Sequence, residues 1–132
     1  MSMPGIAEGV VNQGAFAPDN LIAGDYPCVT RIVIVTGAAL LSRGAVLGQI
    51  DADGRFQLSD ANLTNGAENP DAILAEDVDA SSGDVQAHVY LAGEFNAQAL
   101  TMSAGHTLAS ITKAFRQRPI FLRNLFLHNN QT

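Results

Sequence analysis

The chain has 132 residues, which is enough for one small domain, because single domains run to roughly 100–150 residues. Its formal net charge of −6 argues against docking on bare nucleic acid, since phosphate binding needs clustered Lys and Arg side chains. Its composition is 47% apolar with no Trp, so we expect an aliphatic core that oligomerisation would supplement. Neither a run of about 18 apolar residues nor a secretory signal pattern is present, so we expect no membrane contact and a cytoplasmic origin.

Residues 1–27 are rich in Gly, Asn, Ala and Pro. Their apolar residues show neither the sustained two-residue period of a strand nor the 3.6-residue period of a helix. A segment of this kind buries too little apolar surface to order itself. We therefore expect an extended N-terminal arm over residues 1–27.

The next segment, residues 28–36, is dominated by β-branched residues and lies between Pro27 and Gly37. This composition predicts a buried strand. Cys28 is the only cysteine of the chain, which excludes an intrachain disulfide and a zinc site made of several cysteines. We expect Cys28 to be a small buried hydrophobe, as free cysteines usually are.

Two short strands are predicted over residues 45–50 and 55–58, on either side of Asp51-Ala52-Asp53-Gly54. Asp and Gly supply the turn, and Gly allows the positive φ that a tight hairpin requires. The same four residues resemble the start of a calcium loop, but the third carboxylate and the distal Glu are missing at the required offsets. We therefore predict a hairpin turn and no calcium site.

After a loop over residues 60–70, residues 72–78 return to strand-like content. In residues 85–91 the alternation is regular: Val85, Ala87, Val89 and Leu91 point one way, and Gln86, His88 and Tyr90 point the other. Period-2 alternation predicts a strand with one buried face and one face at an interface or in water.

Between residues 106 and 116 the period changes, because Leu108, Ile111 and Phe115 recur at spacings of three and four. This spacing predicts an amphipathic helix that Pro119 limits. Residues 120–122 and 125–127 are too apolar for a free tail, so we expect them to pack on the domain or on a neighbour. The pattern leaves open whether the chain beyond Leu122 is strand or helix.

Side chains that carry chemistry do not form a catalytic or metal-binding pattern. Glu76, Asp77 and Asp79 are the densest acidic cluster, but on a strand Glu76 would oppose the other two, so solvation or an intersubunit polar contact is favoured. His88 and His106 lack a metal-ligand spacing, and no serine lies in a Gly-x-Ser-x-Gly elbow. We predict no enzyme activity, no cofactor and no metal.

Charge is divided along the chain. Nine of the thirteen acidic residues lie between Asp51 and Asp84, whereas four basic residues and no acidic ones follow Glu94. Two interpretations stay open. The acidic loops and the basic C-terminal part are two solvated faces, or the acidic loops of one subunit face the basic segment of another, which would favour register more than affinity.

The order of these segments resembles that of the lambda-type head decoration proteins of tailed phages. The resemblance covers roughly residues 21–122, and none of its segments is specific alone. It is carried by Ala23-Gly24-Asp25-Tyr26-Pro27, Arg43-Gly44-Ala45-Val46-Leu47-Gly48, Ala72-Ile73-Leu74-Ala75-Glu76-Asp77-Val78-Asp79 and Val89-Tyr90-Leu91-Ala92-Gly93-Glu94-Phe95-Asn96.

The resemblance implies a mainly β fold, a β-clip-like small barrel of short strands with one short C-terminal helix and an extended N-terminal arm. We expect the arm over residues 1–27, the β domain over 28–123 and a C-terminal tail over 124–132. The implied role is structural: a homotrimer on the outer surface of the virion that binds the major capsid protein at three-fold and quasi-three-fold positions of the expanded head. It would stabilise the head against internal DNA pressure, and before assembly it would reside in the host cytoplasm.

We predict that the arm binds the capsid through Leu21, Ile22, Tyr26 and Pro27, unless these residues merely lead into the first core strand. Tyr26 is the strongest anchor candidate because Tyr offers apolar area and a hydrogen-bonding tip. For the trimer contact we predict His88, Tyr90, Phe121 and Leu125. The alternatives are a β-clip module that binds a small ligand and another virion accessory trimer, such as a tail component.

Overall fold

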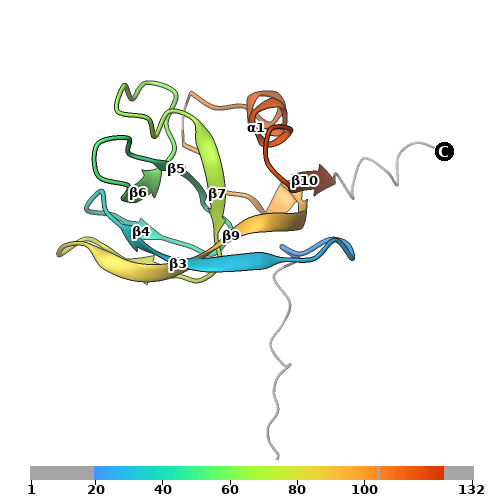
Figure 1. The fold of residues 1–132 in the computed structure, drawn as a ribbon, viewed down its shortest axis with the longest axis horizontal. Helices are drawn as coiled ribbons and strands as arrows, with labels where there is room; N and C mark the ends of the chain where they lie inside the picture. The colour runs from blue at the N-terminus through green and yellow to red at the C-terminus, as the bar shows by residue number, and fades with distance from the viewer. Residues whose placement is uncertain (1–19, 104, 124–132) are drawn as a thin grey trace, which may run out of the picture.

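The computed structural model describes residues 20–103 and 105–123, which form a mainly β domain with one helix (Figure 1). This confirms the predicted fold class. The strands are β3 (Val29–Val35), β4 (Leu40–Leu41), β5 (Val46–Gln49), β6 (Phe56–Leu58), β7 (Pro70–Leu74), β8 (Val78–Asp79), β9 (Val85–Asn96) and β10 (Ile120–Arg123). A 3-10 turn η1 (Ala97–Ala99) and the helix α1 (Leu108–Phe115) separate β9 from β10.

Five of these strands close into a small barrel. The sheet order is β10-β9-β3-β6-β5-β7, and β7 also pairs with β9, so β9, β3, β6, β5 and β7 form a ring. The closing contact is antiparallel, with Ile73 opposite Tyr90 and Leu74 opposite Val89. β9 is 12 residues long and extends past the barrel, where it pairs with β10 in parallel. This extension joins the barrel to the helical side of the molecule.

The side chains of the barrel strands alternate between two cores. On β5, Leu47 packs inside the barrel while Val46 packs outside it, against the helix. On β9, Val89 points inward and Tyr90 outward. Because side chains alternate between the two faces of a strand, the same strands contribute to an inner and an outer core. The outer core consists of Leu21, Val46, Ile73, Tyr90, Phe95, Ile111, Phe115 and Ile120.

The predicted helix is confirmed as α1, and its start is capped. The Thr107 side chain accepts a hydrogen bond from the Ser110 N–H, and the Ser110 hydroxyl accepts one from the Thr107 N–H. This reciprocal cap satisfies two of the N–H groups that every helix start leaves unpaired. Ile111 and Phe115 are fully buried in the outer core, as their spacing predicted.

The other strand predictions hold with altered boundaries. The hairpin forms from β5 and β6, with Gly54 at φ 80° in its turn. The predicted strand over residues 72–78 is split, because β7 ends at Leu74 and β8 pairs separately with β4. The strand predicted over residues 85–91 continues to Asn96 as β9. Beyond Leu122 the described chain stays in strand as far as Arg123.

The strand predicted as buried over residues 28–36 exists as β3, but most of it is exposed. Only Val33 and Val35 are buried, and Ile32 is 57% exposed. The reason is that β3 pairs with β9 over its length but meets β6 at Val35 alone. Cys28, just before this strand, is exposed as well, so its predicted burial is wrong.

Candidate functional site

Arg43 holds three distant segments together. Its Nη1 donates to the Ala75 carbonyl at 2.9 Å and to the Tyr90 hydroxyl at 2.8 Å, and its guanidinium carbon lies 5.5 Å from the centre of the Tyr90 ring. Its backbone N–H donates to Asp77 Oδ1 at 2.8 Å. Charge-assisted hydrogen bonds of this kind are about twice as strong as neutral ones. The Arg43, Ala72 and Val89 segments of the family resemblance therefore meet at this side chain.

Glu94 holds the fourth segment against the body. Its Oε1 accepts a hydrogen bond from the Tyr26 N–H at 3.1 Å. A Cβ at Gly24 would lie 2.2 Å from the same oxygen, so any larger residue there would displace the Glu94 carboxylate from this position. Arg123 closes the arrangement: its Nη1 donates to the Ala23 carbonyl at 2.8 Å and lies 4.0 Å from Glu94 Oε2. The loop that follows the arm's described end is thus fixed to β9 and β10.

The same loop carries an exposed apolar ridge. The rings of Tyr26 and Phe121 meet edge to face with centroids 4.9 Å apart at an interplanar angle of 71°. Ile22, Tyr26 and Phe121 are each between 41% and 45% exposed. We call the Tyr26–Phe121 pair the arm-base ridge; Ile22 is exposed on the same segment as Tyr26. An aromatic pair of this geometry is preorganised, because the two rings already stabilise one another.

The described end of the N-terminal arm runs beside the far end of β9. Ile22 forms an antiparallel bridge with Phe95, and the Asn96 N–H donates to the Leu21 carbonyl at 2.8 Å. Leu21 is 1% exposed and belongs to the outer core, so its side chain offers no free surface. Asn20, the first described residue, has φ 60°, in the left-handed region of the backbone. Residues 1–19 lie outside the described residues.

The residues predicted for a trimer contact do not form one surface. His88 is exposed on the outside of the barrel, while Tyr90 is 8% exposed and packs under Arg43. Phe121 belongs to the arm-base ridge, and Leu125 lies outside the described residues. Alternation correctly placed Tyr90 on the outward face with His88, but the outer core covers Tyr90 and leaves His88 exposed.

His88 is paired with the acidic cluster. The His88 N–H donates to Glu76 Oε2 at 2.7 Å, and its Nδ1 lies 2.9 Å from the same oxygen. The backbone bond, more than the ring, lowers the pKa of Glu76 below its ordinary value. Within the described residues, no group of three or more His, Cys, Asp or Glu side chains is arranged to hold a metal ion.

Basic residues of the C-terminal part pair within their own chain. Arg118 Nε lies 2.6 Å from Asp71 Oδ1, and Arg123 is near Glu94. The sequence left open a contact between the acidic loops of one subunit and the basic C-terminal part of another. In these two contacts, acidic and basic residues of the same chain pair instead. Since both cations have partners here, they give no support to an electrostatic contact between subunits at this place.

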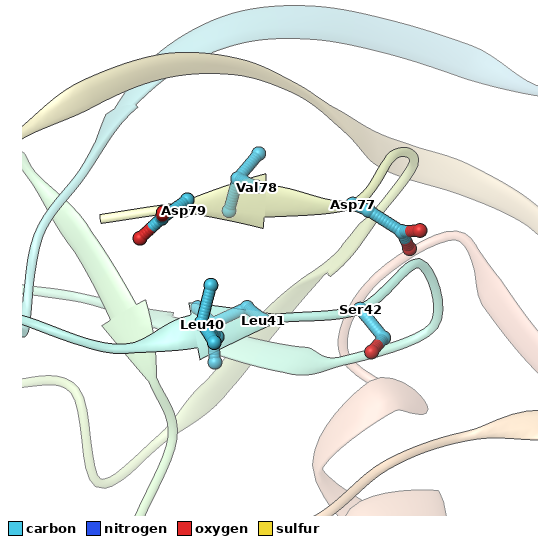
Figure 2. Close-up of a pocket in the computed structure, with 6 residues that line it drawn as sticks. All are labelled: Leu40, Leu41, Ser42, Asp77, Val78 and Asp79. Carbon is cyan, nitrogen blue, oxygen red and sulfur yellow. The ribbon is translucent and has the colours of Figure 1, made fainter. Parts of the chain in front are cut away.

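A shallow pocket of about 320 Å³ lies between β4 and β8 (Figure 2). It is lined by Leu40, Leu41, Ser42, Asp77, Val78 and Asp79. Figure 2 shows Asp77 and Asp79 at opposite ends of β8, with the leucines of β4 beside it. A small-ligand site would need several polar groups that converge on one point. The mostly apolar walls and separated carboxylates lend no support to the ligand-binding alternative.

The family of bacteriophage lambda head decoration protein D matches residues 10–120 of the chain. The chain belongs to this family. A search of curated proteins finds no match. The family is one of structural capsid proteins rather than enzymes, and membership supports a capsid decoration role in the virion. None of the helices in residues 20–103 and 105–123 has the length and apolarity to cross a membrane.

Two side chains join the segments that carried the family resemblance. Arg43 and Glu94 each join segments that are far apart in sequence, and both lie in segments that carried the resemblance. Sequence reasoning noted these segments but missed the contacts, because the hydrogen-bonded partners of Arg43 and Glu94 are 32 to 68 residues away in the chain. The available signal was the glycine at position 24, which permits the backbone to approach a side chain closely.

Proposed function

We propose that this decoration protein binds as a homotrimer to the outer surface of the expanded phage head, at three-fold and quasi-three-fold positions, and stabilises the shell against internal DNA pressure. The observation that carries the proposal is the family match over residues 10–120. The partner is the major capsid protein. The protein resides in the host cytoplasm before it assembles on the virion.

In this proposal the N-terminal arm binds the shell. An extended segment can add as a strand to an exposed sheet edge, with main-chain hydrogen bonds that supply affinity. Three arms in one trimer act together, and linked sites can raise overall affinity by about 10² to 10⁴ without a new kind of contact. Weak individual arms would therefore suffice to clamp neighbouring capsomers.

The arm-base ridge supports this assignment by its position. The arm arrives at Leu21, and Ile22 and Tyr26 are exposed directly after it. A shell bound by the arm would lie against the same part of the body. Of the predicted anchors we keep Ile22, Tyr26 and Pro27 as shell contacts. We assign Leu21 to the core, where it fixes the arm in place.

The test is to mix purified trimer with expanded, undecorated shells and to image the three-fold positions. The full chain is expected to give density there, and a variant that lacks residues 2–19 is expected to remain a trimer and give none. Sedimentation and thermal melting of the truncated variant serve as controls for folding and assembly. Saturation of the shells by the truncated trimer would remove the arm from the proposal, and no density with the full chain would remove the decoration role at these positions.

A further inference from the structure

The first half of β3 is an open sheet edge. β3 pairs with β9 along its length, but its other side meets β6 at Val35 alone. The Ala75 N–H donates to the His88 carbonyl, so the His88 backbone faces β7. Because backbone groups alternate along an antiparallel ladder, Ile32, which is opposite His88, directs its N–H and C=O away from β9. Those groups lie at an edge that no described strand covers.

The exposed side chains along this edge are Val29, Thr30, Arg31, Ile32 and Ile34, of which Thr30, Ile32 and Ile34 share one face and Val29 and Arg31 the other. Ile32 is 57% exposed, and Ile34 on the same face is 37% exposed. Arg31 is exposed and forms no ion pair with any residue in the described part of the chain. The adjacent His88 and Glu76 are paired with each other. An exposed apolar strand edge of this kind is a template for pairing with another chain.

The pocket between β4 and β8 has complementary properties. Leu40 is 73% exposed, the largest exposed fraction among the large apolar side chains of the described residues. Asp77 and Asp79 stand at the two ends of β8 in Figure 2. Each is held by a backbone N–H, that of Arg43 or of Ser81, and neither forms an ion pair within residues 20–103 and 105–123. The pocket therefore offers an apolar surface between two oriented negative charges.

We propose that the open β3 edge of one subunit docks in the β4–β8 pocket of the next, with Ile32 against Leu40 and Arg31 paired with Asp79 at one end of that pocket. This inference rests on the proposed homotrimer and names its contact. The two sides are different surfaces of the same chain, so the contact is head-to-tail, and such a contact closes a three-membered ring when it relates successive subunits by a rotation of about 120°. A second copy is the occupant because the chain itself supplies an exposed cation beside the β3 edge and two carboxylates beside the pocket, and none of the three forms an ion pair within residues 20–103 and 105–123.

Disulfide trapping tests the proposed contact directly. Cys28→Ser removes the native thiol, and Ile32→Cys together with Leu40→Cys then places one thiol on each side of the contact. Under mild oxidation the double variant is expected to give covalent dimers and trimers, whereas either single variant alone gives almost none. Ile32→Cys with Ala109→Cys is the matched control, because Ala109 is exposed on α1, which packs on β7 and β10. Equal cross-linking in the control pair would overturn the proposal.

A charge exchange provides the second test. Arg31→Glu is expected to weaken trimer association about tenfold or more in sedimentation, because like charges across an interface are strongly unfavourable. Asp79→Arg should weaken it similarly, and the double variant should restore most of the loss. Thermal melts of these exposed-site variants report whether the domain itself is intact.

The outcomes separate this inference from the proposed function. If the wild-type chain sediments as a monomer at all concentrations, both the homotrimer and the proposed subunit contact are contradicted. A wild-type trimer whose association neither Arg31→Glu nor Asp79→Arg changes, and in which the Ile32–Leu40 pair does not cross-link, contradicts the contact and leaves the trimer standing.

Discussion

The molecule exposes apolar side chains in two regions that are built differently. On the arm-base ridge, Tyr26 and Phe121 pack on each other, and Glu94 fixes the backbone below them. On the open β3 edge, Ile32 and Ile34 are held by the pairing of β3 with β9. The ridge is therefore a preformed surface, whereas the edge also offers unpaired backbone groups.

This difference indicates two kinds of partner. A preformed aromatic surface binds with little loss of side-chain freedom, which suits a contact that must form on an assembled shell. A strand edge with free backbone groups suits a chain that presents a matching surface in fixed register, as an identical subunit does. Exposed fraction alone, 41% for Tyr26 and 37% for Ile34, does not separate the two regions.

The largest expected effects come from a charge placed in each region. Ile32→Glu buries a carboxylate against Leu40, between the two acids of the pocket, so we expect trimer association to weaken by roughly a hundredfold in sedimentation. Phe121→Glu removes the ring that supports Tyr26, so we expect loss of shell binding with an unchanged trimer. The pair of variants separates the two surfaces, because each should affect one measurement.

The controls are the apolar counterparts at the same positions. Ile32→Val and Phe121→Leu keep apolar contact area and should resemble the wild type in sedimentation and shell binding. If Phe121→Glu dissociates the trimer while Ile32→Glu leaves it intact, the assignment of the two regions is reversed, and the originally predicted trimer role of Phe121 is restored.

A smaller effect is expected from Glu94→Ala, which leaves the ridge residues in place but removes what fixes them. The Tyr26 N–H loses its acceptor, and Arg123 loses a neighbouring charge. We expect shell affinity to fall about tenfold, since the ridge must then order on binding. Titration of shells with labelled trimer measures this change. An unchanged affinity would show that the ridge needs no preorganisation.

Local patterns in the sequence predicted the elements that depend on residues close together in the chain. The spacing of Leu108, Ile111 and Phe115 gave the helix, and Asp and Gly at positions 51–54 gave the hairpin turn. Both signals are local, because helix spacing and turn chemistry depend on neighbours a few residues away. The family resemblance, which depends on the order of segments, gave the small barrel that the structure confirms.

Periodicity could not predict which faces the closed barrel leaves open. The β-branched run of β3 looked buried, yet its exposure depends on how far β6 runs beside it. Tyr90 shares the alternation of His88, yet the outer core covers it because β9 bends past α1 and β10. Such outcomes depend on contacts between residues far apart in the chain.

Tyr90→Phe tests the assignment of Tyr90 to the outer core, away from both binding regions. The change removes the hydroxyl that accepts a hydrogen bond from Arg43 and keeps the ring in the outer core. Hydrogen bonds to charged groups contribute about 1.5–3 kcal/mol, so we expect a loss near the lower end because Arg43 keeps its bond to Ala75. Chemical denaturation measures this loss. A change in trimer association larger than the loss of stability would return Tyr90 to the subunit contact.

The smallest expected effect concerns the end of β3 that pairs with β6. Carboxylates hold this end, so lowering the pH should destabilise it, whereas the open edge has no such carboxylates. Arg55 bridges Asp53 and Asp84, and its Nη1 lies 3.3 Å from the Thr36 hydroxyl directly after β3. The Arg55 side chain lowers the pKa of Asp53, and hydrogen bonds from Thr36 and Arg55 lower the pKa of Asp84.

A carboxylate with a lowered folded-state pKa stabilises the fold above its unfolded value, about 3.8, and this contribution is lost as the pH falls through the folded value. Between pH 5 and pH 2, roughly the range in which such groups titrate, we expect the denaturation midpoint to decrease, and by less in Asp84→Asn. At neutral pH Asp84→Asn should be slightly less stable than the wild type. Ile34→Val, which alters the open edge without a charge, should keep the wild-type pH dependence. If Asp84→Asn loses as much stability in acid as the wild type, the bridge does not hold this end of β3.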